Sequence, residues 1–228
     1  MQEKPIYILI ISLLFCSCDF TTAEQYYDMA YELEEKEKYA EAIPYLDKAI
    51  EKKADFKPAL LNRGADKSML NDYNGAITDY ETILKYDADN TQALLNIGNN
   101  YKRLKNYEKS IKYYTQALST KGAIKNDSTY LVINMPNQWE SETDYYVRKY
   151  EIQYERGISY VYEKKYDLAI ADLLEALKYV DDYPNAMSWI GEVYYHSNDT
   201  INARKYLSQA SKYGMLEAEE LLKKMDSE

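Results

Sequence analysis

The chain has 228 residues, with 38 acidic side chains against 28 basic ones, and a formal net charge of −10. An acidic surface argues against binding to nucleic acid and against electrostatic attraction to anionic lipids. Both cysteines lie at positions 16 and 18, so the rest of the chain can form neither a disulfide nor a thiolate site.

The first element in chain order is an apolar run over residues 6–15, which follows Lys4 and ends at small and cysteine residues. The run is too short to span a membrane as a mature helix, and its flanks are those of a secretory signal. Residues 14–18, Leu-Phe-Cys-Ser-Cys, resemble a bacterial lipoprotein signal. That resemblance implies that residues 1–17 are removed and that Cys18 carries lipid. An ordinary signal cut after Ala23 and a buried N-terminal segment are the alternatives.

Cleavage before Cys18 would leave residues 18–22 as a short tether between the lipid and the folded domain. We therefore expect the protein at the bacterial cell envelope, anchored on the periplasmic or outer-membrane side. Because the surface is acidic, membrane contact should come from the lipid alone.

From residue 23 onward the same pattern recurs with a fixed period. The steps from Ala30 to Gly64, from Gly64 to Gly98, and from Gly157 to Gly191 are each 34 residues. Other columns keep the same phase: Tyr39, Tyr73, Tyr107, Tyr166; Ala42, Ala76, Ser110, Ala169, Ala203; and Leu46, Tyr80, Tyr114, Leu173, Leu207. A period in this range indicates a solenoid, in which each unit buries its apolar face against its neighbours.

Each unit contains two amphipathic helical patterns joined by a short polar turn. Antiparallel helices approach closely where side chains are small. We therefore expect the four glycines to face the small column Ala76, Ser110, Ala169 and Ala203 across each hairpin. The larger column that contains Tyr80 and Tyr114 is then expected to fill the space between hairpins.

These columns resemble the tetratricopeptide repeat, a 34-residue helix–turn–helix unit. The matching units are 23–56, 57–90, 91–124, 150–183 and 184–217, which places three units in 23–124 and two in 150–217. The resemblance implies an all-α, right-handed superhelical solenoid of hairpins. The family's bulky aromatic near the start of each unit and its proline near the end are mostly missing. Residues 218–228 look like a capping helix.

The period breaks once, at an insertion over residues 125–149. Residues 128–134 read as extended and 135–138 as a turn, and from about Glu142 the pattern predicts an N-terminal extension of the next helix. Loops of this length are often functional or disordered. Its aromatic residues, Tyr130 and Trp139 among them, weigh against plain disorder, and it is either a binding element or a structural plug.

The search for catalytic chemistry finds little. His196 is the one histidine and lies at a predicted helix end, and no His/Cys cluster is spaced for zinc. Residues 87–90 begin like a calcium loop, but Gln92 stands where that loop needs glycine. We predict no enzyme, no metal and no cofactor.

In the family that the repeats resemble, the first helix of each unit lines a concave groove. That implies a groove lined by Tyr27, Tyr31, Asn62, Asn96, Asn99, Arg103, Tyr154, Tyr162, Trp189 and Tyr195, with Asp28, Glu155 and Glu192 beside them. Asn62 and Asn96 occupy equivalent positions, and amides spaced in this way can hydrogen-bond the backbone of an extended peptide. The family's clamp for a terminal carboxylate is matched only in its asparagines.

We therefore expect an exported, lipid-anchored scaffold or adaptor that binds a protein or peptide in its groove. The alternative is a carbohydrate-binding accessory lipoprotein that uses Trp139, Trp189 and tyrosines as stacking platforms.

Overall fold

The structure, a computed structural model, describes residues 19–124, 146–179 and 184–227. The predicted signal peptide with Cys18, and the insertion residues Tyr130 and Trp139, lie outside the described residues. Within the described ranges no helix is both long enough and apolar enough to cross a membrane.

The described residues form helical hairpins in sequence, followed by one further helix. The pairs are α1 (Ala23–Glu34) with α2 (Tyr39–Lys52), α3 (Lys57–Met69) with α4 (Tyr73–Tyr86), α5 (Thr91–Arg103) with α6 (Tyr107–Ser119), α7 (Lys149–Tyr162) with α8 (Tyr166–Leu177), and α9 (Pro184–His196) with α10 (Thr200–Lys212). The last helix, α11 (Leu216–Ser227), packs on α10 and begins two residues before the predicted capping segment.

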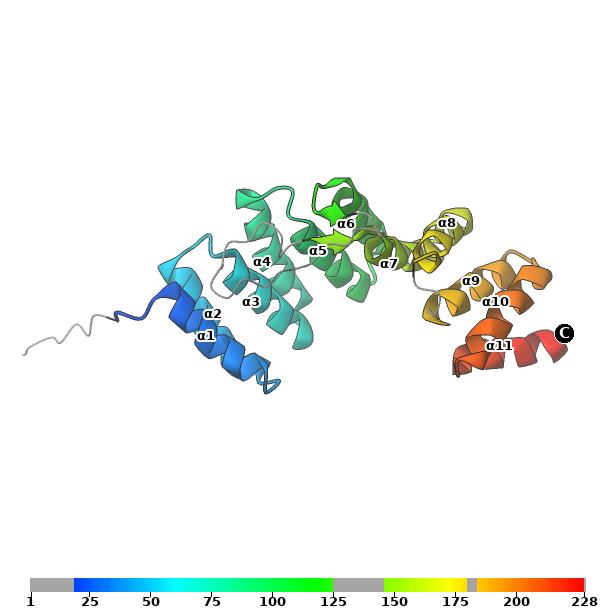
Figure 1. The fold of residues 1–228 in the computed structure, drawn as a ribbon, viewed down its shortest axis with the longest axis horizontal. Coiled ribbons are helices and arrows are strands. Elements are labelled where there is room, and N and C mark those ends of the chain that lie inside the picture. The colour runs from blue at the N-terminus through cyan, green and yellow to red at the C-terminus, as the bar shows by residue number, and fades with distance from the viewer. Residues whose placement is uncertain (1–18, 125–145, 180–183, 228) are drawn as a thin grey trace, which may run out of the picture.

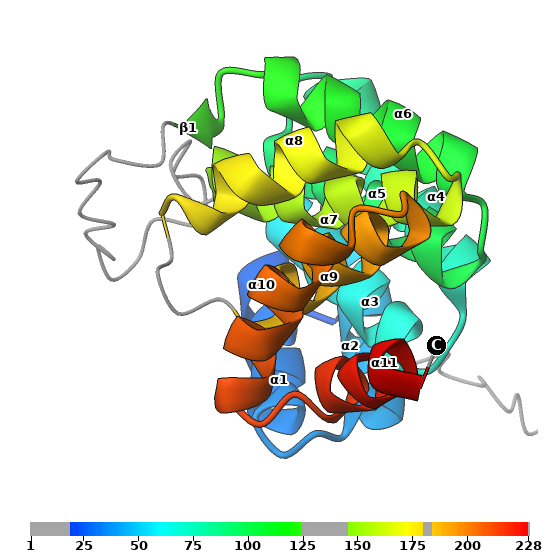
Figure 2. The same ribbon diagram turned by 90° about the vertical axis from the view of Figure 1, so that its right-hand side faces the viewer.

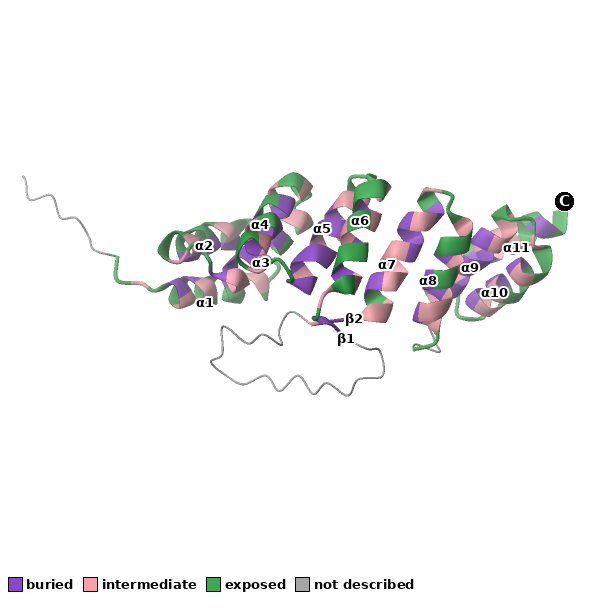
Figure 3. Ribbon diagram, turned by 90° about the horizontal axis from the view of Figure 1, so that it is seen from above, coloured by how far each residue is buried: buried purple, intermediate pink, exposed green. Residues whose placement is uncertain are grey.

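The hairpins stack side by side into an elongated solenoid (Figure 1). Successive hairpins are turned relative to one another, as the view along the stack shows (Figure 2). Buried residues lie on the helix faces that meet neighbouring helices, and exposed residues lie on the outer faces (Figure 3). Each hairpin therefore completes its core only through the next one.

The turn between the two helices has the same form in every hairpin. Its central residue adopts the left-handed conformation, with φ between 56° and 66° at Glu37, Asn71, Lys105, Lys164 and Asn198. The next N–H then donates back into the first helix, as Asp72 does to the carbonyl of Lys67 at 2.8 Å, which satisfies a helix-end acceptor. Asp72 also caps the second helix by accepting from the N–H of Gly75 at 2.9 Å.

The four glycines lie closest to side chains other than those that we predicted. A Cβ added to Gly64 would lie 2.7 Å from the Tyr80 ring, and one added to Gly191 would lie 2.6 Å from Cγ of Leu207. Gly98 meets Tyr114, and Gly157 meets Leu173, in the same way. The residue facing each glycine is always 16 positions later (64 to 80, 98 to 114, 157 to 173, 191 to 207).

The nearest neighbours of these glycines are therefore not the predicted Ala76, Ser110, Ala169 and Ala203, except that an added Cβ at Gly157 would also lie 3.4 Å from the carbonyl oxygen of Ala169. The larger column does not lie only between hairpins, because its side chains cross the glycine inside their own hairpin. Tyr80 and Tyr114 are almost fully buried there. The absence of a Cβ on the first helix is what makes room for a bulky side chain of the second.

The insertion is bracketed by two short parallel strands, β1 (Ala123–Ile124) and β2 (Val147–Arg148), with Ala123 paired to Val147. A predicted helical extension from about Glu142 is wrong for the described residues 146–148, because α7 begins only at Lys149. Val147 is β-branched and buried, and its N–H donates to the carbonyl of Gly122 at 2.9 Å. Burial and pairing of Val147 thus favour the strand.

The contact between Gly191 and Leu207 can be tested by the substitution Gly191→Ala. Alanine gains about 1 kcal/mol of helix propensity, but overpacking against Leu207 costs about 1–3 kcal/mol. We expect a net loss of about 1 kcal/mol in the free energy of unfolding, measured by urea titration with circular dichroism. In a Leu207→Ala background the loss should be smaller, because the added methyl then no longer meets the leucine side chain and only the backbone nitrogen of residue 207, 3.0 Å away, still crowds it. An equal loss in both backgrounds would contradict the contact.

Candidate functional site

A cavity of about 430 Å³ lies between the first helices of the second and third hairpins. We call it the amide pocket. Its lining residues come from α3 (Ala65, Ser68, Met69), from the α3–α4 turn and α4 (Asn71, Tyr73, Tyr80), and from one face of α5 (Asn96, Asn99, Asn100, Arg103). The four α5 residues follow an i, i+3, i+4, i+7 spacing, which places them on one side of the helix.

The tyrosines that cross the glycines bring their hydroxyl groups toward the groove side chains. The hydroxyl of Tyr114 donates to Oδ1 of Asn99 at 2.7 Å. Tyr80 lines the amide pocket, and burial raises its pKa well above the usual range, against the opposing effect of a hydrogen bond with Ser68. Burial likewise raises the pKa of Tyr114. Both phenols therefore stay protonated, and Tyr114 acts as a donor to Asn99.

Two of the three predicted groove asparagines, Asn96 and Asn99, line the amide pocket, and their carbonyl oxygens are already used inside the protein. Asn99 accepts from Tyr114, and Oδ1 of Asn96 accepts from Nε2 of Gln92 at 3.1 Å. Asn100 is buried, and it accepts from Ser68 at 2.7 Å and donates to the backbone of Asn96 at 2.8 Å. The chemistry that Asn96 and Asn99 can offer a ligand is therefore donation from their amide nitrogens, and at Asn96 part of that capacity is used by a hydrogen bond with Tyr80.

A second cavity of about 400 Å³ adjoins the amide pocket, since Arg103 lines both. We call it the basic aromatic pocket. Its lining residues are three cations at the end of α5 and in the following turn, and four apolar or aromatic side chains from α6, α7 and α9: Lys102, Arg103, Lys105, Tyr107, Ile158, Tyr162 and Trp189.

The aromatic residues of this pocket form one cluster across three hairpins. The rings of Tyr107 and Tyr162 stack with centroids 4.4 Å apart and planes 7° apart. Trp189 meets Tyr162 edge to face at 5.9 Å. Tyr162 is nonetheless 50 % exposed. The cluster thus presents preorganised aromatic surface to the cavity.

The groove of the first two hairpins is occupied by an internal network of polar side chains. Nδ2 of Asn62 donates to Oε2 of Glu34 at 2.7 Å and lies 3.2 Å from the Tyr27 hydroxyl. Asp66 is only 3 % exposed, and burial, together with the charge of Glu34, raises its pKa to about 7. Burial also raises the pKa of Glu34. Two carboxyl groups therefore compete for protons in a poorly solvated position.

Two buried ion pairs at equivalent positions of the repeat were not predicted from the sequence. The guanidinium of Arg63 donates to Asp79 from two nitrogens. That of Arg156 donates to Asp172 in the same way, with Nε 2.7 Å from Oδ2 and Nη2 2.8 Å from Oδ1. Each arginine directly precedes one of the four helix glycines, Gly64 or Gly157, and the aspartate lies 16 residues after its arginine. These pairs join the two helices of a hairpin and serve the scaffold.

The structure brings some predicted groove residues together and leaves others apart. Asn96, Asn99 and Arg103 share the amide pocket, and Arg103, Tyr162 and Trp189 share the basic aromatic pocket. The remaining predicted residues line neither. Tyr27 and Asn62 bond to one another, Tyr154 packs on the core of the fourth hairpin, Tyr195 lies under Lys224 of α11, and Tyr31 is 50 % exposed.

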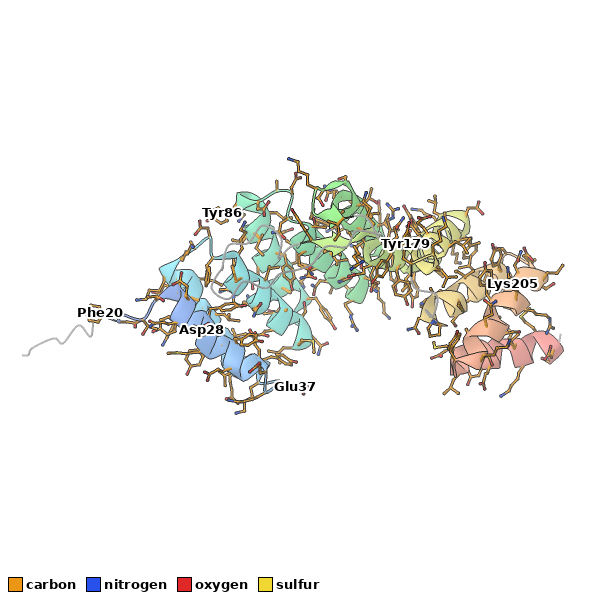
Figure 4. All side chains as sticks on the ribbon, viewed as in Figure 1. Phe20, Asp28, Glu37, Tyr86, Tyr179 and Lys205 are labelled. Atoms are coloured by element: carbon orange, nitrogen blue, oxygen red, sulfur yellow. The ribbon has the colours of Figure 1, made fainter. Side chains whose placement is uncertain are left out.

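Of the flanking carboxylates, Glu155 pairs with Lys102, and Glu192 lies 3.7 Å from His196. Asp28 is exposed on α1, and Glu37 marks the first hairpin turn (Figure 4). Over the ranges that the structure describes, no group of three or more potential ligand side chains could hold a metal ion.

Family models of the tetratricopeptide repeat match residues 23–55, 91–123 and 154–213. The chain therefore belongs to the tetratricopeptide repeat family, and the predicted family is confirmed. No protein of curated function matches the chain.

Solved structures with the same fold include several repeat proteins. YrrB, a tetratricopeptide repeat protein with an unusual peptide-binding site, shares 17 % identity at a TM-score of 0.67, over 88 % of this chain and 92 % of its own. MamA from Desulfovibrio magneticus RS-1 shares 15 % at 0.68, over 83 % and 93 %. Pseudomonas aeruginosa pilF shares 17 % at 0.64, over 83 % and 75 %. The predicted solenoid of hairpins is thus confirmed, and the fold supports a protein–protein interaction scaffold.

The buried carboxyl of Asp66 predicts a pH-dependent stability. Its folded pKa of about 7 lies above the ordinary value of 3.8, so folding favours the protonated form. That stabilisation is complete below pH 4 and is lost as the pH rises toward 7. Asp66→Asn stays neutral, and it should raise the free energy of unfolding at pH 8, relative to wild type, by on the order of 2 kcal/mol.

The measurement is denaturant unfolding at pH 5 and pH 8, with Asp55→Asn, at an exposed position between α2 and α3, as the control. Asp55→Asn should keep the wild-type pH dependence. If Asp66→Asn kept it as well, Asp66 would not be its source.

Proposed function

We propose that this protein is an exported, lipid-anchored and non-catalytic scaffold that binds an extended segment of a partner polypeptide. The observation that carries the proposal is the adjoining pair of cavities, of about 430 and 400 Å³, that meet at Arg103. Together they form a groove that runs from the second hairpin to the fifth. Its length and its mixture of polar and aromatic walls suit a peptide chain.

The amide pocket supplies the general part of recognition. Asn96 and Asn99 hold their carbonyl oxygens in internal hydrogen bonds. The amide nitrogen of Asn99, and the part of the Asn96 amide that does not bond Tyr80, can donate to a ligand. Backbone carbonyl groups recur along any extended peptide and accept such bonds whatever the side chains are. YrrB, which has the same fold, is a protein with an unusual peptide-binding site, and this likeness favours a peptide ligand here.

The aromatic arrangement favours a peptide over the carbohydrate alternative. A sugar ring stacks on an open aromatic face, but Tyr107 and Tyr162 cover one face of each other. Trp139, the other predicted stacking residue, lies outside the described residues. The basic side chains beside the cluster also give the pocket a charge that a neutral sugar would not use.

A lipid on Cys18 would hold the solenoid close to the membrane surface. Thr22 begins α1 through a capping box with Gln25, only four residues after Cys18. Asp19 accepts from the Tyr26 hydroxyl at 2.6 Å and lies 3.3 Å from Nζ of Lys52. Phe20 projects outward, 88 % exposed (Figure 4). Because Asp19 contacts Tyr26 and Lys52 of the first hairpin, the chain between the lipid and the domain would be short.

The groove is tested by photo-crosslinking in native membranes. A photoreactive amino acid at Ala65, exposed in the amide pocket, should capture a discrete partner, whereas one at Lys85, exposed on α4, should not. Adding Asn96→Ala and Trp189→Ala to the Ala65 probe should reduce capture roughly tenfold or more, because an amide donor and an aromatic anchor are both lost. The same products from both probe positions would contradict a groove-bound partner.

Lipid anchoring is tested by substituting each of the two cysteines in turn. Cys18→Ala should abolish incorporation of labelled palmitate and move the protein from the membrane to the soluble fraction. Cys16→Ala is the matched control and should leave the label and the location unchanged. Label retained in Cys18→Ala would mean that the lipid is not on Cys18.

A further inference from the structure

The basic aromatic pocket concentrates positive charge on a chain whose net charge is −10. Of its three cations, Lys102 is paired with Glu155 of α7. Within the described residues, Arg103 and Lys105 form no ion pair. Among the residues that the structure describes, two cations beside one cavity thus have no ion-pair partner, which is the complement of an anionic ligand.

Local structure fixes the backbone positions of Arg103 and Lys105. Arg103 is the last residue of α5, and Lys105 is the left-handed residue of the turn, with φ of 57°. The N–H of Asn106 donates to the carbonyl of Tyr101 at 2.8 Å, which closes the turn. The backbone that carries both cations is therefore held by the hairpin, and less ordering is needed when a ligand binds.

The remaining wall is apolar and comes from other hairpins. Ile158, Tyr162 and Trp189 line the same cavity as the cations. Tyr162 is 50 % exposed, and the edge of an aromatic ring carries partial positive charge. A ligand that combines a carboxylate with an adjoining apolar group would satisfy both walls together.

We propose that the basic aromatic pocket selects peptide segments in which a carboxylate side chain lies next to an apolar or aromatic one. Arg103 and Lys105 bind the carboxylate, and Ile158, Tyr162 and Trp189 contact the apolar side chain. This inference rests on the peptide-binding groove proposed above, and it adds the chemistry of the partner. Because the whole chain repels anions at long range, the segment should carry one or two carboxylates and not a long acidic run.

The test begins with a display library of random short peptides, selected on the full-length protein. Peptides from wild type should be enriched in acidic residues beside apolar ones. Selection on Arg103→Glu/Lys105→Glu should lose that acidic enrichment, and selection on Lys85→Glu/Lys223→Glu should keep it. The control reverses two exposed lysines, on α4 and α11, and so matches the change in net charge.

Synthetic peptides then give the magnitude. The probe is the most enriched acidic peptide, and its matched partner replaces each Asp by Asn and each Glu by Gln. Binding is followed by the fluorescence of Trp189 in a full-length Trp139→Phe variant. We expect the carboxamide peptide to bind at least tenfold more weakly. Arg103→Gln/Lys105→Gln, the milder variant, should bind the acidic peptide at least tenfold more weakly than its parent.

The outcomes separate this inference from the proposed function. Peptides enriched on wild type but without acidic residues, and lost on Asn96→Ala, would leave the groove standing and overturn the inference. Equal affinity for the acidic peptide and for the matched carboxamide peptide would also overturn it. No enrichment of any peptide on wild type would overturn both.

Discussion

The contact between a helix glycine and the bulky residue 16 positions later is the constraint on which the rest of the structure depends. At Gly64, Gly98, Gly157 and Gly191 a side chain of the second helix occupies the space that a Cβ would fill. A glycine in a helix interior costs about 1 kcal/mol relative to alanine, and close packing over it offsets that cost. The same contact sets the approach of the two helices in four hairpins, and hence the surface on which the next hairpin stacks.

The identity of that bulky residue divides the groove into two parts. In the second and third hairpins it is Tyr80 and Tyr114, whose hydroxyl groups extend past the glycine to the amides of α5. In the fourth and fifth it is Leu173 and Leu207, which carry no polar group. Tyr80 accordingly lines the amide pocket, whereas Ile158, Tyr162 and Trp189 of the second pocket come from the two hairpins whose bulky residue is leucine. Peptide backbone and peptide side chain would thus be recognised in neighbouring regions of one groove.

Periodicity predicts the hairpins, their turns and the solenoid, because every column repeats in step. It does not identify which column faces the glycines, since the alanine and tyrosine columns share the period and only side-chain reach distinguishes them. Asn96, Asn99 and Arg103 were predictable from the family resemblance, which implies that the first helix of each unit lines the groove. Lys105 and Tyr107 were not, because they enter the second pocket from a turn and a second helix through the stacking of hairpins. The β2 strand at Val147 likewise depends on a partner strand distant in sequence.

The most direct test of the central contact is a pair of crystal structures, of wild type and of Gly98→Ala. Our account predicts that the added methyl pushes α5 away from α6 and that the Tyr114 hydroxyl separates from Oδ1 of Asn99, which lies 2.7 Å from it in the wild-type protein. An unchanged α5–α6 spacing with that hydrogen bond intact would contradict the account, because the glycine would then not be what positions the tyrosine.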